Sequence, residues 1–404
     1  MKVEVVKYRS EWAREFEAEA ERIKEILGDE AIEIYHIGST SVEGLSAKPI
    51  IDIMPVVKDI SRIDKLNPAF EALGYECMGE FGIPGRRYFR KGGEKRTHQI
   101  HVFGRESEYD IFRHIAVRDY LRRHADKAEE YGCLKEELAE KYPFDIEGYC
   151  DGKDSFVKNM EREALKEFYA LSYLSRDKNS YVDMSECISR GAAKILFSGS
   201  AGVLLYEKSS GIYMLAAEEK EAAEKILKFL GEEDLKRRSG LLVVHGEAAR
   251  SAAYERLGLK GETACFQVVY TSKTPRILKG NLIFRIPERA EIERIKSEYH
   301  LESPENIEKL YSERKIWCGF LKSGEFVGFI GRHPEGSMGL LQVFPEYRRQ
   351  GYGEELESFM INRFLEEGRV PYAHIIVDNE KSMNLQKKLG YEVADKKIYW
   401  LFEK

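Results

Sequence analysis

The 404-residue sequence lacks the features that would place it in a membrane or outside the cell. No run approaches the ~18 consecutive apolar residues that a membrane-spanning helix requires. The first residues carry charges where a secretory signal needs an apolar core. The six cysteines are scattered and include no C-x-x-C pair, which argues against a zinc ribbon and a disulfide scaffold. We therefore expect a soluble, cytoplasmic protein without a membrane partner.

An excess of charge of one sign is also lacking, since 64 Lys and Arg stand against 70 Asp and Glu, for a formal net charge of -6. This mild acidity gives no general affinity for nucleic acid. With 43% hydrophobic and 33% charged residues, the composition supports packed cores and excludes a largely disordered chain. The length of 404 residues predicts two to four domains.

Hydrophobic periodicity divides the chain into three segments. Residues 1–168 combine strands with long, charged helices, which predicts an α+β domain. Residues 169–280 and 281–404 each mix strands with helices, one of them expected over 219–231, in an order typical of α/β structure. The predicted fold class is therefore a multidomain combination of α+β and α/β structure. The similar order of elements in the last two segments suggests divergent copies of one fold.

The most specific motif is LQVFPEYRRQGYG at residues 341–353. A predicted strand ends before Pro345, and the pattern R-x-x-G-x-G, from Arg348 to Gly353, opens a helix. Unpaired backbone N–H groups at a helix start bind anions, and glycines let a phosphate approach the backbone closely. The spacing is too short for an ATP-type phosphate loop and lacks the third glycine of a dinucleotide fingerprint. The sequence therefore predicts a diphosphate site at this turn.

This segment resembles the acyl-CoA-binding motif of the GNAT N-acyltransferase superfamily, Q/R-x-x-G-x-G/A. Residues 379–391, NEKSMNLQKKLGY, resemble the second signature of that family, and the likeness extends over about residues 281–404. The resemblance implies a GNAT N-acetyltransferase fold and activity. It also implies acetyl-CoA as the acyl donor and an amine of a small molecule or peptide as the acceptor.

The resemblance further implies which residues bind the acyl-CoA. The backbone of residues 341–343 is expected to pair with the pantetheine arm, and the amides of residues 349–354 are expected to hold the diphosphate. Asn379 is expected to bond the pantetheine side. The predicted binding set is Leu341, Gln342, Val343, Arg348, Arg349, Gln350, Gly351, Tyr352, Gly353, Glu354 and Asn379.

Two catalytic positions follow from the same resemblance. The family often has a tyrosine in the second signature that protonates the departing thiolate, and Gln386 occupies that position here. A glutamine cannot act as an acid, although its amide can hydrogen-bond a developing thiolate. Acyl transfer to an amine also needs a base, for which Glu335, just before a predicted strand, and Glu346, in the turn, are candidates.

The middle segment, residues 169–280, has no comparable glycine-rich turn between a strand and a helix. Its sequence LLVVHGEAARSAA has one glycine, followed by an acidic residue where a diphosphate would lie. We interpret the segment as a degenerate GNAT-like half that shapes the acceptor cleft. An unrelated α/β spacer is the alternative.

A second motif, HIGSTSVEGLSAKPIIDI at residues 36–53, lies in the N-terminal segment. A Gly-Ser turn after a strand, followed by an acidic strand, is the layout of the nucleotidyltransferase fold. The motif resembles the hallmark of the GrpB family, and the likeness extends over about residues 1–168. In the nucleotidyltransferase fold the turn holds a triphosphate and paired carboxylates hold Mg²⁺. Here Met54 stands where the second carboxylate is needed, so we expect phosphate-ligand or nucleotide binding without transfer of the two-carboxylate type.

We expect a ligand site around this turn. Its candidate residues are Gly38, Ser39, Thr40, Ser41, Lys48, Asp52, Arg86, Arg87, His98 and His101. His98 and His101 lie on one predicted strand, and we expect them to share the site. With Asp52 they could hold a divalent transition metal, or the whole set could form a polar cleft around a phosphate. The sequence leaves these alternatives open.

The sequence supports three functional hypotheses. The first is an acetyl-CoA-dependent N-acyltransferase fused to a GrpB-like domain that binds a phosphate-bearing ligand. The second is a nucleotidyl- or phosphoryltransferase at the Ser39–Asp52 region, with the GNAT part as a CoA-binding regulatory module. The third is a protein that binds both ligands without catalysis. The single carboxylate at Asp52 counts against the second, so we favour the first.

Overall fold

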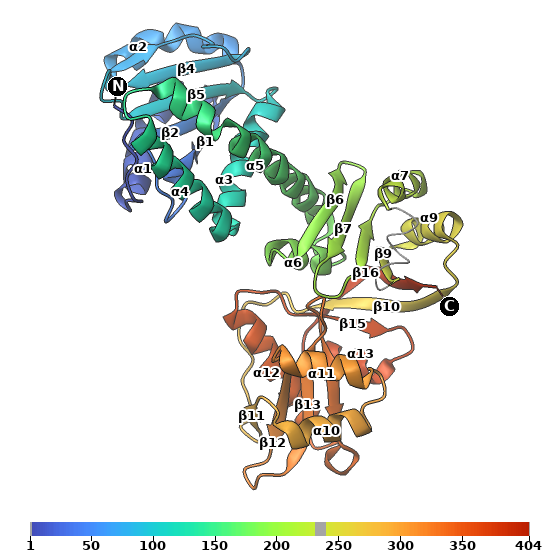
Figure 1. The fold of residues 1–404 in the computed structure, drawn as a ribbon. Helices are drawn as coiled ribbons and strands as arrows, with labels where there is room; N and C mark the ends of the chain where they lie inside the picture. The colour runs from blue at the N-terminus through green and yellow to red at the C-terminus, as the bar shows by residue number, and fades with distance from the viewer. Residues whose placement is uncertain (1, 231–239, 404) are drawn as a thin grey trace. The chain divides into compact units, whose positions relative to one another are not determined.

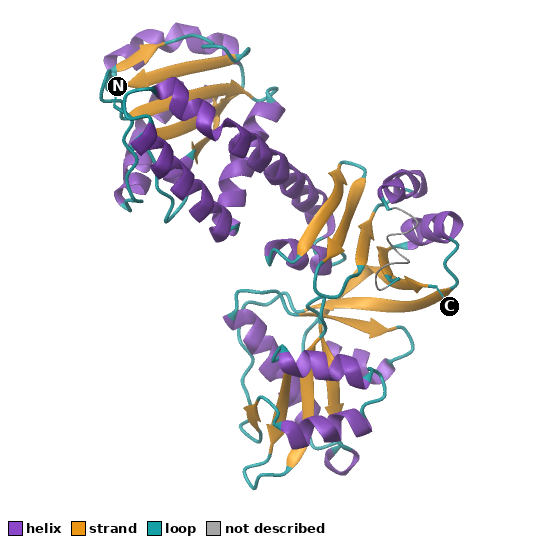
Figure 2. Ribbon diagram, viewed as in Figure 1, coloured by secondary structure: helices purple, strands orange, loops and turns teal. Residues whose placement is uncertain are grey.

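The computed structural model describes residues 2–230 and 240–403, which form two compact units divided between Phe168 and Tyr169. We call them the N-terminal and the C-terminal unit (Figure 1). Both combine β-sheets with helices (Figure 2), and the predicted mixed α+β multidomain class is confirmed. The last residue of the helix expected over 219–231 lies outside the described residues. Among the helices that are described, none is both long and apolar enough to cross a membrane.

The N-terminal unit has a five-stranded sheet in the order β1-β2-β5-β4-β3, in which β2 and β5 are parallel and the other neighbours antiparallel. Its strands are β1 Ala31–Ile37, β2 Ile51–Val57, β3 Tyr75–Cys77, β4 Arg86–Lys91 and β5 His98–Gly104. Its helices are α1 Glu11–Leu27, α2 Asn67–Ala72, α3 Glu108–Arg123, α4 Ala125–Lys141 and α5 Ile146–Leu174, and short 3₁₀ turns include η2 Ser39–Ser41.

Burial explains how the helices of this unit are distributed over its sheet. Trp12 and Ile23 recur at helical spacing on α1 and are fully buried against Ile53 of β2 and Ile100 of β5. On the opposite face, Ile111 of α3 packs with Met54. Because side chains alternate along a strand, Asp52 lies on the same face of β2 as Met54. The turn after β1 and the acidic strand therefore meet on the α3 side of the sheet.

The C-terminal unit has one eleven-stranded sheet in the order β11-β12-β13-β14-β15-β10-β16-β9-β8-β7-β6. Its strands are β6 Ala193–Gly199, β7 Gly202–Glu207, β8 Tyr213–Ala216, β9 Leu242–His245, β10 Gly261–Val269, β11 Ile283–Arg285, β12 Ile316–Phe320, β13 Phe326–Arg332, β14 Met338–Val343, β15 Tyr372–Ile376 and β16 Glu392–Phe402. Its helices, after the end of α5, are α6 Val182–Ser189, α7 Lys220–Ile226, α9 Glu247–Leu257, α10 Arg289–Glu298, α11 Pro304–Ser312, α12 Tyr352–Glu366 and α13 Glu380–Lys388.

The element order repeats within this sheet. The series β6-β7-β8-α7-β9-α9-β10 and the series β12-β13-β14-α12-β15-α13-β16 have the same succession of strands and helices. In both, the third and fourth strands are parallel. The last strands are exchanged, because β10 pairs with β15 and β16 pairs with β9. β10 also pairs with β16, so the two halves form one continuous sheet that has no break at residue 280.

Helices cover both faces of each half. In the first half, α7 and α9 pack on one face, and α6 with the end of α5 packs on the other. In the second half, α12 packs on one face, while α10 and α11 pack on the other. Figure 1 shows α10 and α11 lying across β12 and β13. Each half is therefore a three-layer arrangement in which the sheet is buried on both sides.

Candidate active site and a second cavity

The strands β14 and β15 touch at only one point in the sheet. Met338 pairs with Ala373, and no further pair of these strands follows within the described residues. Leu340 has a φ of 54°, a left-handed conformation that is rare for a leucine. The register between β13 and β14 shifts there, as in a β-bulge. The bulge bends β14 away from β15 and opens the sheet.

A cavity of about 570 Å³ lies at this divergence. Of the predicted residues, Leu341, Asn379, Gln386 and Glu335 line it, whereas Gln342, Val343 and residues 348–354 do not. The side chain of Asn379 caps α13, where its Oδ1 accepts the N–H of Ser382 at 3.1 Å. Other lining residues that matter below are Glu302, His333, Met338, Gly339, Glu357, Ala373 and His374.

The predicted diphosphate turn leads directly into α12. Arg349 and Gly351 have φ values of 62° and 87°, so two left-handed residues turn the chain before the helix begins at Tyr352. Such a turn aims the first helical N–H groups outward. The side chains of Arg348, Arg349 and Gln350 are exposed. Within the turn, the Arg348 guanidinium donates from Nε to the carbonyl oxygen of Val343 at 3.1 Å.

Two lysines, which the sequence motif did not reveal, stand beside this turn. Lys279 and Lys388 each donate to Glu354 Oε2 at 2.9 Å. The Lys279 Nζ lies 3.7 Å from the position that a Cβ on Gly351 would occupy. The negative charge of the Glu354 side chain is therefore paired with two cations. Lys279 precedes the motif by about seventy residues, and only the tertiary fold brings it there.

Gln386 is buried in the wall of the cavity, with 2% of its surface exposed. Its Nε2 donates to Glu357 Oε1 at 3.1 Å, and its Oε1 has no hydrogen-bond partner among the described residues. Burial raises the pKa of Glu357 to about 7. Glu357 also accepts from the hydroxyl of Tyr391 at 3.4 Å. Sequence reasoning missed Glu357 because it stands in the middle of a helix; its position on the buried stripe of α12 was the available signal.

Of the two base candidates, Glu335 reaches the cavity and Glu346 does not. Glu335 is 3% exposed, and its Oε1 accepts from Ser337 Oγ at 2.5 Å. Arg190 fixes its backbone, donating to the Glu335 carbonyl oxygen at 2.6 Å. Glu346 is exposed and pairs with Arg294 at 2.8 Å. Glu346 is therefore not placed to act as the expected base, because it does not line the cavity.

A histidine and a glutamate that the motifs did not reveal face each other at the cavity. His333 follows β13, and its Nδ1 lies 3.8 Å from Glu302 Oε2. The imidazole lies over Gly339 so closely that a Cβ there would collide with its Nε2. Gly339 adjoins the single point where β14 meets β15. A carboxylate beside one ring nitrogen orients an imidazole and leaves the other to exchange a proton.

His374 of β15 belongs to a buried polar cluster. Its Nε2 is 2.9 Å from Gln267 Oε1, and the Gln267 amide donates to the Asn179 carbonyl oxygen at 2.7 Å. An amide oriented in this way accepts from Nε2–H, which leaves Nδ1 as the acceptor atom. Nδ1 has no partner among the described residues. Burial lowers the pKa of His374, so the ring is neutral near pH 7.

The same cluster contains Asp183 and His245, both fully buried. His245 Nε2 lies 2.9 Å from Asp183 Oδ1, and its Nδ1 is bonded to the Leu215 carbonyl oxygen at 3.0 Å. The pair is an ionic one, because the aspartate raises the pKa of His245 against the cost of burial, and the histidine lowers that of Asp183. Both nitrogens of His245 are thus used, in contrast to His374.

In the N-terminal unit, the Gly-Ser turn lines a cavity of about 250 Å³. Gly38 has a φ of 69°, and a Cβ at this position would collide with the Asp52 carboxylate. Five of the predicted residues line this cavity, and the structure adds five polar ones. The predicted residues are Gly38, Ser39, Thr40, Lys48 and Asp52, and the additional ones are Gln99, Tyr131, Lys135, Tyr149 and Lys153.

The other predicted residues do not line it. His101 lies 3.7 Å from Asp52, and Arg86 donates to His101 Nδ1 at 3.3 Å, so both stand behind the carboxylate. Arg87 forms a two-bond pair with Asp64 at the surface. The expected sharing of one site by His98 and His101 is wrong. Their positions differ by three, an odd number, so they point to opposite faces of β5, and His98 lies toward Glu19.

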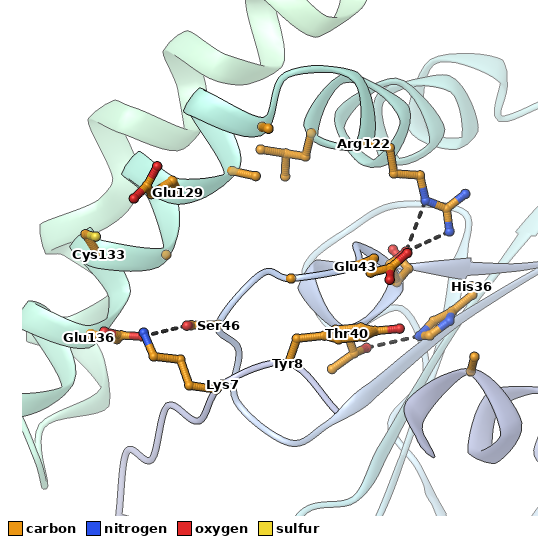
Figure 3. Close-up of a pocket in the computed structure, with 17 residues that line it drawn as sticks. Lys7, Tyr8, His36, Thr40, Glu43, Ser46, Arg122, Glu129, Cys133 and Glu136 are labelled. Carbon is orange, nitrogen blue, oxygen red and sulfur yellow. Dashed lines mark hydrogen bonds and ion pairs between the residues drawn. The ribbon is translucent and has the colours of Figure 1, made fainter. Parts of the chain in front are cut away.

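Ser41 lies on the far side of the turn, at a second cavity of about 740 Å³ (Figure 3). There Arg122 donates to the Ser41 carbonyl oxygen at 2.7 Å, and His36 Nε2 lies 3.1 Å from Thr40 Oγ1. The Thr40 hydroxyl donates to the Ile50 carbonyl oxygen at 3.3 Å, so it accepts from the histidine. Burial lowers the pKa of His36 to about 4. These bonds hold the turn between the two cavities.

Within the described part of the chain, no group of three or more His, Cys, Asp and Glu side chains is placed to hold a metal ion. Met54, at the position of the missing carboxylate, is fully buried in an apolar cluster with Phe103 and Ile111. Asp52 is instead surrounded by lysines, tyrosines and the Gln99 amide.

Comparison with known families finds two matches in this chain. The family described as GrpB protein matches residues 2–163, and the family described as FR47-like protein matches residues 318–401. The UPF0157 protein YqkA of Bacillus subtilis is 45% identical over 165 residues, 41% of this chain and 48% of YqkA. The Glutamate-rich protein GrpB of Alkalihalophilus pseudofirmus is 33% identical over 164 residues, 39% of this chain and 94% of that protein. The chain thus spans about half the length of YqkA.

Solved structures resemble each unit. The conserved protein GrpB from Enterococcus faecalis is 46% identical, with 41% of this chain and 99% of that chain covered and a TM-score of 0.40. A putative acetyltransferase from the GNAT family, from Novosphingobium aromaticivorans, is 14% identical, with 57% of this chain and 98% of that chain covered and a TM-score of 0.35.

Proposed function

We infer that this chain, which belongs to the GrpB family through residues 2–163 and carries an FR47-like domain over residues 318–401, is an N-acyltransferase. Its donor is an acyl-CoA, by default acetyl-CoA, and its acceptor is an amine of a small molecule or a peptide. The observation that carries this proposal is the divergence of β14 and β15 at the bulge of Leu340, above a 570 Å³ cavity and beside the turn into α12.

The residues of the cavity fit a thioester ligand. Beyond Met338, no described residue of β14 pairs with β15. Backbone N–H groups near Leu340 and Leu341 could therefore donate to the carbonyl oxygen of a thioester. Two buried polar atoms in the wall, Gln386 Oε1 and His374 Nδ1, have no partner among the described residues. Buried polar atoms are nearly always hydrogen-bonded, so these two indicate a ligand or ordered water. The turn at residues 348–353 supplies the amides for the diphosphate.

When bound, acetyl-CoA supplies the thioester carbon that a neutral amine attacks. The chain's own residues must then remove a proton from the amine and provide one to the thiolate. Glu335 and His333 are the candidate bases, and His333 is the better placed because Glu302 orients it and its ring is partly exposed. At the other wall Glu357, with a pKa of about 7, can carry a proton, and Gln386 holds the carboxyl group in place by donating from Nε2 to its Oε1. Gln386 itself orients and donates a hydrogen bond.

Binding of CoA tests the proposal directly. Gly353 has helical dihedrals, and a Cβ there would meet only ordinary contacts, the nearest being Val343 Cγ2 at 3.7 Å. Gly353→Glu places a carboxylate at the first helical turn, where a diphosphate would be repelled. We expect calorimetry to show CoA affinity at least 100-fold weaker. Gly353→Gln has the same size without the charge and is expected to retain most of the affinity. Equal affinities of wild type and Gly353→Glu would refute the diphosphate site.

Release of the CoA thiol from acetyl-CoA, in the presence of a panel of primary amines, tests the base. General bases contribute about 10²–10⁴-fold to a rate. We expect His333→Gln to lower kcat within that range, with CoA affinity unchanged. Glu335→Gln serves as the comparison. A larger loss of kcat in Glu335→Gln than in His333→Gln would identify Glu335 as the base.

For the N-terminal unit we propose a binding role for a phosphate-bearing ligand or a nucleotide. The cavity beside the Gly-Ser turn supports it, because the three lysines Lys48, Lys135 and Lys153 line it together. A thermal-shift scan of the full chain with phosphate, ATP and CTP, each with and without Mg²⁺, tests this role. If none of these ligands raises the Tm of the chain, the binding role is contradicted.

A further inference from the structure

Three lysines from three different elements converge on the 250 Å³ cavity of the N-terminal unit. Lys48 precedes β2, Lys135 lies on α4 and Lys153 lies on α5. None of them forms an ion pair within the described residues. Lys135 Nζ instead donates to Ser39 Oγ at 2.8 Å. Buried cations are normally paired with a carboxylate, so an unpaired cluster of three needs an explanation.

The surroundings disfavour the charges of Lys135 and Lys48. Lys135 is only 2% exposed. Burial and the repulsion of Lys153 and Lys48 lower its pKa to about 7, and burial and Lys153 also lower the pKa of Lys48. The rings of Tyr131 and Tyr149 lie beside them: Lys135 Nζ is 4.3 Å from the first centroid, and Lys48 Nζ is 5.3 Å from the second. The ligand-free cavity thus holds like charges together at a cost in stability.

A second, independent observation points to the same cavity. The Tyr149 hydroxyl is fully buried and finds no hydrogen-bond partner among the described residues, although Tyr149 lines the cavity. The Ser39 hydroxyl accepts the bond from Lys135 and is also hydrogen-bonded to the Tyr131 side chain. Three lysines and the Tyr149 hydroxyl therefore line one small space from several sides. This set of donors lacks an acceptor of comparable charge.

We propose that this cavity binds a phosphate group as its dianion and without a metal ion, either free or as the terminal phosphate of a small ester. The inference rests on the binding role proposed for the N-terminal unit and narrows its ligand. The three lysines outnumber the single carboxylate of Asp52 in the cavity lining, and the charge of a phosphate dianion is opposite to the excess of positive charge. A Mg²⁺-nucleotide would bring a dication toward the lysines, and Asp52 is the one carboxylate in the cavity lining to receive it.

Lys153→Met and Lys158→Met form a matched pair of variants on α5. Lys158 is 76% exposed and pairs with Asp154, outside the cavity. The full chain is titrated calorimetrically in phosphate-free buffer with inorganic phosphate, phenyl phosphate, and ATP with and without Mg²⁺. We expect phosphate or phenyl phosphate to bind without Mg²⁺, with an affinity at least 10-fold weaker in Lys153→Met and unchanged in Lys158→Met. Tighter binding of inorganic phosphate would indicate a free phosphate as the ligand, and tighter binding of phenyl phosphate would indicate a phosphate ester.

Other outcomes overturn the inference in distinguishable ways. Binding that Lys153→Met leaves unchanged would place the phosphate elsewhere. Binding of ATP only with Mg²⁺ would overturn the metal-free phosphate and leave the broader binding role standing. No binding of any probe would overturn both. None of these results depends on acyl transfer, since the cavity lies wholly within the N-terminal unit.

The stability of the ligand-free protein gives a second readout. Lys135→Met removes a buried charge that faces Lys48, Lys153, Asp52, Glu136 and the Tyr131 hydroxyl. A binding site predicts a higher Tm of the ligand-free variant together with loss of the phosphate-induced Tm shift. A purely structural lysine predicts a lower Tm, which would count against the proposal.

Discussion

The two halves of the C-terminal sheet share one order of elements and differ at one junction. In the first half, β8 and β9 are parallel and paired at four consecutive positions, from Tyr213 with Leu242 to Ala216 with His245. In the second half, β14 and β15 pair only at Met338 and Ala373. The cavity occurs where the ladder is lost. The comparison teaches that the repeated architecture alone does not open a cavity between these strands, and that the bulge at Leu340 accompanies one.

The buried histidines on the corresponding strands β9 and β15 also differ between the two halves. His245, on β9 of the closed half, uses both ring nitrogens, whereas His374, on β15 of the open half, leaves Nδ1 without a partner among the described residues. The carboxylate of Asp183 lies 2.9 Å from His245 Nε2 and 3.8 Å from His374 Nε2. His245 is thus satisfied by protein groups, whereas His374, which lines the cavity, keeps one ring nitrogen without a partner among the described residues.

The largest effect is expected at the aspartate that these histidines share. Asp183→Asn leaves His245 without its charge partner, and breaking a buried pair costs about 3–5 kcal/mol of unfolding free energy. Denaturant unfolding, followed through Trp317 and Trp400 in a Trp12→Phe background, measures it. Glu255→Gln, at an exposed ion pair with Lys220, is the control and is expected to change stability by less than about 1 kcal/mol.

The pH dependence of that pair has a defined sign. The raised pKa of His245 gives stability that is present below its ordinary value near 6.5 and is lost as pH rises through the folded pKa. The lowered pKa of Asp183 gives stability that is present above its ordinary value near 3.8 and is lost as pH falls. Asp183→Asn is therefore expected to flatten the profile at both ends. An unchanged profile would contradict the ionic pair.

The next effect concerns the carboxyl group in the wall of the open half. The pKa of Glu357 is raised to about 7, so its contribution to stability is full below pH about 4.5 and falls as pH rises to about 7. Glu357→Gln removes this loss, and we expect the variant to be more stable than wild type by about 3 kcal/mol at pH 8 and nearly equal to it at pH 4. Glu354→Gln, on the same helix but ion-paired, should not show this trend. Equal pH profiles for Glu357→Gln and wild type would be evidence against a raised pKa.

A pair of glycines sharpens the comparison between the halves. Gly202 of β7 lies against the carbonyl oxygen of Ala216 at the end of β8, and Gly328 of β13 lies against that of Gln342 near the end of β14. A Cβ at either position would collide with backbone, so each Gly→Ala variant should lose about 1–3 kcal/mol of stability. Only Gly328→Ala is expected to weaken CoA binding as well. Equal effects of both variants on CoA affinity would remove the distinction between the halves.

The smallest effect is expected at the surface of the diphosphate turn. Lys279 pairs with Glu354 and is half exposed, so Lys279→Met should change stability by less than about 0.5 kcal/mol. Its position beside Gly351 predicts a several-fold loss of CoA affinity that diminishes at high salt, measured by titration at two salt concentrations. Lys225→Met, on α7 of the closed half, is the control for the loss of a surface lysine.

Motifs whose residues are contiguous in the chain could be identified from the sequence. The turn at residues 348–353 leads into α12 as expected, because glycine spacing and a helix start are local properties. The Gly-Ser turn at residues 38–41 also stands beside Asp52 as expected. In contrast, Glu302 and His333 carry no local signal, since a glutamate or histidine in a loop is ordinarily a surface residue.

By itself, the sequence determined the order of elements, the two glycine-containing turns that follow strands, and the position of the carboxylate in β2. Tertiary structure alone decided that β10 and β16 are exchanged between the halves, that the ladder closes at β9 and opens at β15, and that three lysines meet beside Ser39. The physical reason is the range of the forces involved. Turns and strand periodicity depend on neighbours in the chain, whereas strand pairing and the burial of charge depend on residues that only folding brings together.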